Sequence, residues 1–130
     1  MNRRKDSEAS LIKAGYTIKN AVIQEVDIVV EGICVKFKMQ LKTHSKSFIV
    51  TSNDLGSYEI NRGFCGDSDS TYYAMCYADI MNIIGVDKLR DLFGKYVRLV
   101  INDDIQSIVM VGNIIDDYWC ETDSLHTEVV

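Results

Sequence analysis

The sequence predicts an α+β domain: an antiparallel β-sheet of about five strands with helices packed on one face. Residues 33–42 alternate between apolar and polar side chains, which is typical of a strand with one buried and one solvated face. Apolar residues before Gly85 recur at helical spacing, and Gly85 suits the left-handed residue that ends many helices. Two further apolar stretches, 96–101 and 105–115, follow. The resulting order is strand, strand, strand, helix, helix, strand, strand, which favours helices gathered on one face of an antiparallel sheet.

The first half of the chain predicts a run of strands. Residues 16–30 form the first strand, and Glu31-Gly32 supplies a tight turn before the second strand at 33–42. A polar turn at 43–46 leads into a third strand at 47–51.

The second half predicts helices and a closing pair of strands. Polar residues and glycines dominate 52–70, which we expect to be a long, partly structured loop. Asp87 can cap a short second helix that ends at Gly94. The closing strands join through Asn102-Asp103-Asp104, a polar trio that suits a hairpin turn. Trp119 is expected to lie buried at the end of the sheet core. The expected core face of the first helix carries Tyr73, Cys76, Tyr77, Ile80 and Ile84.

Length and composition predict one domain. The chain has 130 residues, of which 47% are hydrophobic and 25% charged, an ordinary globular composition. We divide it into a polar N-terminal arm at 1–15, an α+β domain at 16–120 and an acidic C-terminal tail at 121–130, which we expect to fray. No stretch approaches the roughly 20 apolar residues that cross a bilayer, and the four cysteines form no Cys-x-x-Cys pair. The sequence therefore predicts a cytoplasmic protein.

No constellation of residues predicts catalysis. The two histidines, His44 and His126, lie away from any strained nucleophile motif such as Gly-x-Ser-x-Gly. A pair of Cys65 with His44 is the enzymatic alternative. The cysteines and histidines lack the spacing of zinc sites, and residues 67–78 lack the glycine and glutamate of a calcium loop. We therefore expect no enzyme activity, no metal and no cofactor.

Short motifs within residues 16–120 resemble a family of small proteins encoded in phage and prophage genomes, generally without assigned function. The motifs are two strand segments, a glycine loop, a capped helix and a final strand with its loop: Thr17-Ile18-Lys19-Asn20-Ala21, Leu92-Phe93-Gly94-Lys95-Tyr96-Val97-Arg98, Gly63-Phe64-Cys65-Gly66, Ile80-Met81-Asn82-Ile83-Ile84-Gly85-Val86-Asp87 and Gly112-Asn113-Ile114-Ile115-Asp116-Asp117-Tyr118-Trp119. The chain departs from this family at Phe64-Cys65, where relatives have a richer glycine run, and at Leu89, where they have a tryptophan. The resemblance implies a phage or mobile-element context, with the host cytoplasm as the location.

We expect a non-enzymatic phage accessory protein that acts by binding, as an anti-CRISPR-like inhibitor of a bacterial immunity protein. The net charge of −5 argues against direct nucleic-acid binding, which needs a basic surface to neutralise phosphates. An acidic face can instead meet the basic channel of a protein that handles nucleic acid. The candidate partner contacts are one tyrosine and six aspartates: Tyr58, Asp67, Asp69, Asp103, Asp104, Asp116 and Asp117.

The alternative is a protein that sequesters a nucleotide signalling molecule without hydrolysing it. Arginine and aromatic side chains can clamp a base or a phosphate by stacking and in-plane hydrogen bonds. Association through a sheet edge would build such a pocket between chains, so this alternative also predicts a homo-oligomer. The candidate ligand contacts are Arg62, Phe64, Tyr72 and Arg98.

Overall fold

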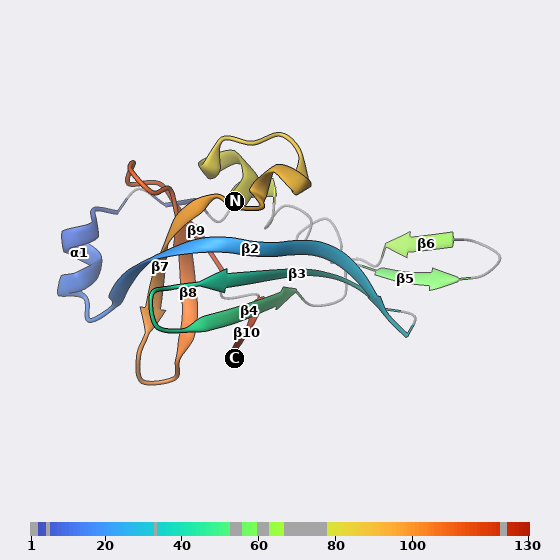
Figure 1. The fold of residues 1–130 in the computed structure, drawn as a ribbon, viewed down its shortest axis with the longest axis horizontal. Helices are drawn as coiled ribbons and strands as arrows, with labels where there is room; N and C mark the ends of the chain where they lie inside the picture. The colour runs from blue at the N-terminus through green and yellow to red at the C-terminus, as the bar shows by residue number, and fades with distance from the viewer. Residues whose placement is uncertain are drawn as a thin grey trace.

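One antiparallel sheet organises the chain (Figure 1). The computed structural model describes residues 3–4, 6–32, 34–52, 56–59, 63–66, 78–122 and 125–130. In these residues ten strands join in the order β1-β9-β8-β7-β2-β3-β4-β10, with β5 and β6 attached to the side of β3. The strands are β1 (Arg3–Arg4), β2 (Thr17–Glu31), β3 (Cys34–Lys42), β4 (Ser47–Ser52), β5 (Gly56–Glu59), β6 (Gly63–Gly66), β7 (Tyr96–Asn102), β8 (Ser107–Gly112), β9 (Trp119–Glu121) and β10 (Leu125–Val129).

Three short helical segments accompany the sheet. They are α1 (Glu8–Lys13), residues 78–84 and the 3-10 helix η1 (Leu89–Leu92). None of the helices in the described ranges has the length and apolar character needed to span a bilayer. The fold is therefore mostly β, and α+β-like in its arrangement.

The longest strand, β2, pairs with two different neighbours and so joins the two halves of the sheet. It has 15 residues: Thr17 to Val22 pair with β7, and Val22 to Glu31 pair with β3. A shift of register between Ile23 and Glu25 marks the changeover, as a β-bulge does. Figure 1 shows β2 crossing the molecule between the two sets of strands.

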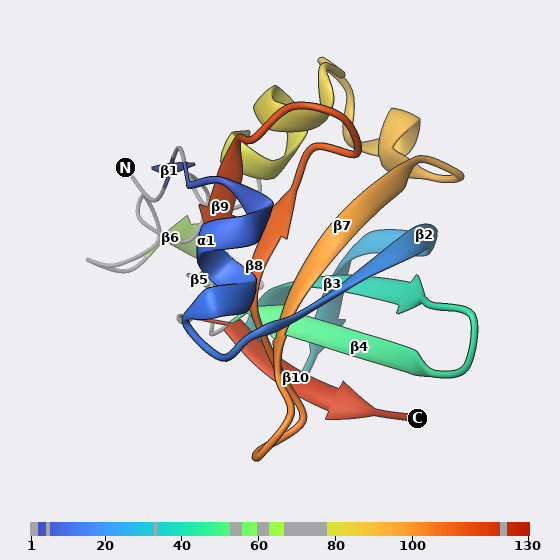
Figure 2. The ribbon, with the colours of Figure 1, turned by 90° about the vertical axis from the view of Figure 1, so that its left-hand side faces the viewer.

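Both faces of β7 are buried, each against a different layer. On one face Val97, Leu99 and Ile101 enter the main core, which residues 78–84 and η1 cover through Ile80, Ile83 and Leu92. On the other face Val100 belongs to a second cluster beneath α1 (Figure 2). That cluster is completed by Leu11, Met110 and Trp119. The two predicted helices share one face, whereas α1 lies on the other.

The regular strand patterns of the sequence are confirmed. Strands at Thr17–Glu31, Cys34–Lys42 and Ser47–Ser52 match the first three predicted strands to within a residue or two. The alternation in β3 buries Phe37, Met39 and Leu41. Burial of Trp119 is confirmed. Gly85 ends the helix at a φ of 93°, and the N–H groups of Gly85 and Val86 both bond to the carbonyl of Met81.

Several predictions that depended on weak local patterns are wrong. Within the stretch 52–70, where a partly structured loop was expected, β5 and β6 form an antiparallel pair. The end of the chain does not fray as expected, because β10 pairs with β4 in register from Leu125 to Val129. The sheet also curls, so that the N–H of Ile108 in β8 donates to the hydroxyl of Thr127 in β10. The number of strands therefore exceeds the prediction of about five.

The chain ends and the last hairpin also differ from the predictions. In the N-terminal arm, residues 8–13 form the short helix α1, which Ser7 caps and whose Leu11 is buried against the sheet. Lys88, not Asp87, occupies the cap position of η1, without a side-chain bond. The strand predicted at 105–115 is shorter, because Ile105 lies in the turn before β8 and the strand ends at Gly112. The first part of the longer predicted helix, with Tyr73, Cys76 and Tyr77, lies outside the described residues.

Removal of residues 123–130 should destabilise the protein by about 3 kcal/mol or more, because β10 contributes a row of backbone hydrogen bonds to β4. Chemical denaturation of the shortened chain measures this loss. As a control, Glu128→Gln changes an exposed residue of β10 and should leave the free energy of unfolding within about 0.5 kcal/mol of wild type. Equal stability of the shortened and full-length chains would show that β10 adds nothing to the fold.

Candidate functional site

Arg98, Gly112 and Trp119 lie in one line across three strands. Arg98 in β7 pairs with Gly112 in β8, and Gly112 pairs with Trp119 in β9. Because glycine has no side chain, the indole ring lies directly over Gly112, where an added Cβ would sit 2.1 Å from Trp119 Cε3. The guanidinium carbon of Arg98 is 4.4 Å from the centre of the indole ring, a cation–π stack. The glycine therefore provides the space in which arginine and tryptophan meet.

The guanidinium of Arg98 is held by hydrogen bonds on three sides. Nε donates to the carbonyl of Asn113 at 2.7 Å, and Nη2 donates to the carbonyl of Asp116 at 2.7 Å. Two carboxylates complete the set: Glu8 lies 3.1 Å from Nη1 and Asp117 lies 3.3 Å from Nη2. The Arg98 side chain is almost fully buried while both carboxylates are about half exposed, so the arginine is compensated and the acids remain partly hydrated.

The Arg98 cluster, formed by Arg98, Gly112 and Trp119, also fixes the N-terminal segment. The indole Nε1 of Trp119 donates to the carbonyl of Asp6 at 2.7 Å, and Glu8 in the first turn of α1 pairs with Arg98. Leu11 adds an apolar contact from the same helix. A helix of six residues has little stability of its own, so these tertiary contacts hold it in place.

The loop 113–118 is bound to this cluster along most of its length. The Asn113 side-chain oxygen accepts from the N–H groups of Ile115 and Asp116, both at 2.8 Å, which forms an Asx turn. The Asn113 amide nitrogen donates to the carbonyl of Ile83 at 2.7 Å and so ties the loop to the helix at 78–84. The loop closes where the Asn113 N–H donates to the carbonyl of Tyr118 at 3.0 Å. Its backbone is therefore fixed on both sides.

This fixed loop exposes apolar side chains. Ile115 is 82% exposed, and Ile114 and Tyr118 are partly exposed beside it. Asp116 and Asp117 are exposed on the same loop. A rigid loop that holds an isoleucine in water with acidic neighbours has the form of an anchor for another protein surface.

The turn at the other end of the β7–β8 hairpin carries a similar set of residues. Ile105 is 68% exposed, and the neighbouring Asp103 and Asp104 are exposed as well. The hydroxyl of Thr17 donates to the Asp103 carboxylate, and the N–H of Asp104 donates to the side chain of Asn102. Figure 2 shows the two loops at opposite ends of the hairpin, so the four described aspartates of the predicted set form two separate groups.

The remaining predicted contacts are placed only in part. Tyr58 in β5 and Phe64 in β6 are opposite each other in the register of that pair. Arg62, Asp67, Asp69 and Tyr72 lie outside the described residues. Of the four predicted ligand contacts, Arg98 is the one with a described side chain, and its hydrogen bonds are made within the protein.

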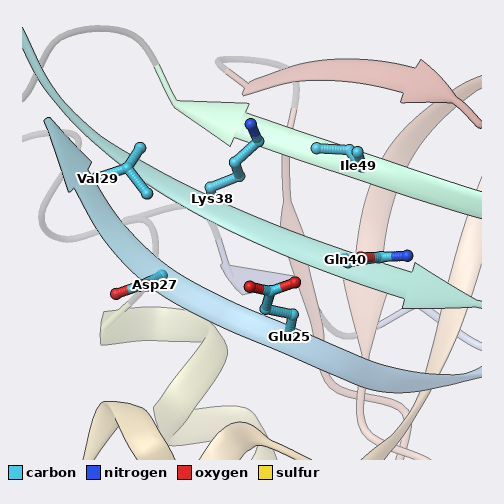
Figure 3. A pocket seen from close by; sticks show the side chains of 6 residues that line it. All are labelled: Glu25, Asp27, Val29, Lys38, Gln40 and Ile49. Carbon is cyan, nitrogen blue, oxygen red and sulfur yellow. The ribbon is translucent and has the colours of Figure 1, made fainter. Parts of the chain in front are cut away.

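A shallow depression of about 270 Å³ lies on the open face of β2, β3 and β4 (Figure 3). Asp27 pairs with Lys38 across the strands, and Glu25 pairs with Gln40. One carboxylate oxygen of Asp27 accepts from the N–H of Ile28 at 2.9 Å. Two carboxylates and one lysine line the depression, so its charge is mixed. Its full lining is Glu25, Asp27, Val29, Lys38, Gln40 and Ile49.

The sequence prediction named Asp116 and Asp117 but missed Asn113 and Ile115. Asn113 had been placed inside a strand, although asparagine directly after a glycine is a turn signal. Ile115 was counted as an apolar strand residue, and no local pattern separates a buried isoleucine from one held in solvent.

Comparisons with protein-family models, curated proteins and solved structures found no match. The resemblance to phage-encoded proteins therefore stays a prediction. Within the described ranges no three His, Cys, Asp or Glu side chains gather in the way that a metal ion requires. Cys120 is buried and not in a disulfide, and its thiol donates to the carbonyl of Glu121 at 3.6 Å.

Replacing Arg98 with lysine should lower the free energy of unfolding by about 2 kcal/mol, because an ammonium keeps the charge but cannot make the same set of in-plane contacts. The chain has a single tryptophan, so Trp119 fluorescence should also shift to longer wavelength as the N-terminal segment loosens. Arg90→Lys, at an exposed site in η1, is the matched control and should change neither signal. Unchanged stability and fluorescence in Arg98→Lys would show that the cluster does not hold the loop.

Proposed function

We propose that the protein is a non-enzymatic binding protein, an anti-CRISPR-like inhibitor that docks on a bacterial immunity protein through the 113–118 loop. The observation that carries this proposal is the rigid presentation of Ile115. Fixing the backbone of one mobile loop residue on association costs about 1–2 kcal/mol. A loop whose backbone is already fixed by Arg98 and Asn113 avoids much of that cost.

The chemistry of the loop indicates what the partner surface must offer. Ile115, with Ile114 and Tyr118 beside it, fits an apolar pocket. Asp116 and Asp117 would lie at the rim of that pocket, where basic side chains on the partner complement them. Basic surface patches are typical of proteins that handle nucleic acid, the class of immunity protein expected from the phage resemblance.

Sequestration of a nucleotide through the predicted set of residues has less support. Arg98 would have to give up contacts with Asn113, Asp116 and the carboxylates before it could hold a phosphate. Each lost bond to a charged group costs about 1.5–3 kcal/mol. The binding hypothesis needs no such rearrangement.

Phage plating on bacteria that each express one defined CRISPR effector tests the proposal. Wild-type protein should restore plaque formation in at least one strain, and Ile115→Asp should abolish this effect because a charge cannot enter an apolar pocket. A loss of about 2 kcal/mol or more, roughly 30-fold in affinity, is expected for an anchor residue. Binding of each variant to the purified effector provides the affinity.

Ile105→Asp is the matched control, since it places the same change on an exposed isoleucine at the opposite end of the hairpin. It should retain full inhibition. Loss of inhibition in Ile105→Asp but not in Ile115→Asp would assign the contact to the other turn. Failure of the wild-type protein to protect phage from any of the effectors would remove the proposed function.

A further inference from the structure

One edge of the sheet ends at β10, which has a paired neighbour on one side only. β4 pairs with β10 from Leu125 to Val129, and β10 is the last strand in the order of the sheet. Figure 2 shows its C-terminal half at the margin of the molecule. An unpaired strand edge presents a row of backbone N–H and C=O groups that can pair with another strand. The sheet can therefore be extended at β10.

The hydrogen bonds to β4 indicate which backbone groups of β10 point outward. The N–H of Val130 donates to the carbonyl of Ser47 at 2.9 Å, one step beyond the register of the two strands. Bonded positions alternate along an antiparallel strand, so the backbone groups of Glu128 also point toward β4. Those of Thr127 and Val129 point away from it. Within the described ranges no hydrogen bond occupies these outward groups.

The nearby strand β8 contacts a side chain of β10 and not its backbone edge. The N–H of Ile108 donates to the hydroxyl of Thr127 at 3.3 Å. Thr127 lies opposite the buried Val50, so its side chain points to the core face of the sheet while its backbone groups lie in the plane of the sheet. Val129, on the same face, keeps 46% of its surface exposed. A further strand beside β10 would cover part of that surface.

β10 lacks the features that usually keep an edge strand from pairing. Natural edges are protected by proline, by lysine or by a bulge. β10 reads Leu-His-Thr-Glu-Val, and its register with β4 runs without a shift. It does carry one acidic side chain, the exposed Glu128. A strand that pairs with this edge must therefore place a hydrogen-bond donor opposite the carboxylate.

The sequence of β10 is complementary to itself in one antiparallel register. With a two-fold axis at Thr127, that residue faces its own copy and Leu125 faces Val129 of the second chain. Outward backbone groups meet at these positions, so the strands would exchange about six hydrogen bonds. The same register places His126 opposite Glu128, twice by symmetry. An imidazole offers an N–H to a carboxylate in both of its protonation states, and such pairs across strands stabilise a sheet.

We infer that two copies of this chain associate through β10, in antiparallel pairing about a two-fold axis at Thr127. A second copy is the occupant that the charges favour, since each His126 supplies the donor that Glu128 of the other chain needs. Two five-residue strands bury less than the roughly 1,000 Å² of a stable interface, so the dimer is weak and forms at high protein concentration. The inference goes beyond the proposed function and uses none of the residues of the 113–118 loop, so either can fail without the other.

Sedimentation velocity of the full chain, from micromolar to millimolar concentration, tests this dimer and should show a reversible monomer–dimer equilibrium. Glu128→Lys should raise the Kd of the dimer at least about tenfold, because both symmetric pairs with His126 become repulsive. His126→Glu should weaken the dimer in the same way. The double variant with both substitutions places glutamate opposite lysine and should restore dimerisation.

Asp91→Lys is the matched control, because it makes the same change of charge at an exposed site in η1. At physiological salt it should leave the Kd of the dimer unchanged, since distant exposed charges are screened. Val129→Pro should abolish the dimer, because proline lacks the outward N–H, while the ladder between β10 and β4 remains.

Amide hydrogen exchange locates the contact. Raising the protein concentration should slow exchange at Thr127 and Val129 but not at Glu128, whose N–H already points to β4. The inference is overturned if the chain stays monomeric at millimolar concentration, if Asp91→Lys weakens the dimer as much as Glu128→Lys, or if the double variant fails to restore it. A dimer that Val129→Pro does not weaken would be held by another surface and would also overturn it.

Discussion

The stack of Arg98 on Trp119, over the bare backbone of Gly112, is the contact on which the candidate site depends. It joins β7, β8 and β9, draws in the N-terminal segment through Asp6 and Glu8, and fixes the loop that follows β8. A buried arginine is expensive unless its donors are used and its charge is compensated. Here two backbone carbonyls and two half-exposed carboxylates meet both needs. The arginine that first suggested a phosphate ligand therefore acts as a structural centre.

The path of β2 explains why one face of the sheet has a covered and an open portion. Its first part pairs with β7 and its second part with β3, so one strand carries both the covered and the open portion of the same sheet face. Around Ile18 the face is covered by the second cluster with α1, and from Val22 onward it is open. The loop at 113–118 lies beyond the covered portion.

Sequence alone predicted the elements whose signal is local. The alternation in residues 33–42 predicts a strand, and the glycine at position 85 predicts the end of a helix. Both signals depend only on residues close together in the chain, and both predictions hold. The elements that were missed, β10 and α1, are stable because of contacts with β4 and with the Arg98 cluster, which lie far away along the chain. The candidate site was predicted only in part, for the same reason. The acidic residues at 116 and 117 can be read from the sequence, whereas the exposure of Ile115 depends on the Arg98 cluster.

Amide hydrogen exchange of the wild-type protein tests most directly whether the Arg98 cluster holds the 113–118 loop rigid. The N–H groups of Ile115 and Asp116 donate to Asn113, while His44 and Ser45 lie in an exposed turn without such bonds among the described residues. We expect the amides of Ile115 and Asp116 to exchange at least about tenfold more slowly than those of His44 and Ser45, after correction for intrinsic rates. Equal exchange in the two regions would contradict a preorganised loop and remove the basis for Ile115 as an anchor.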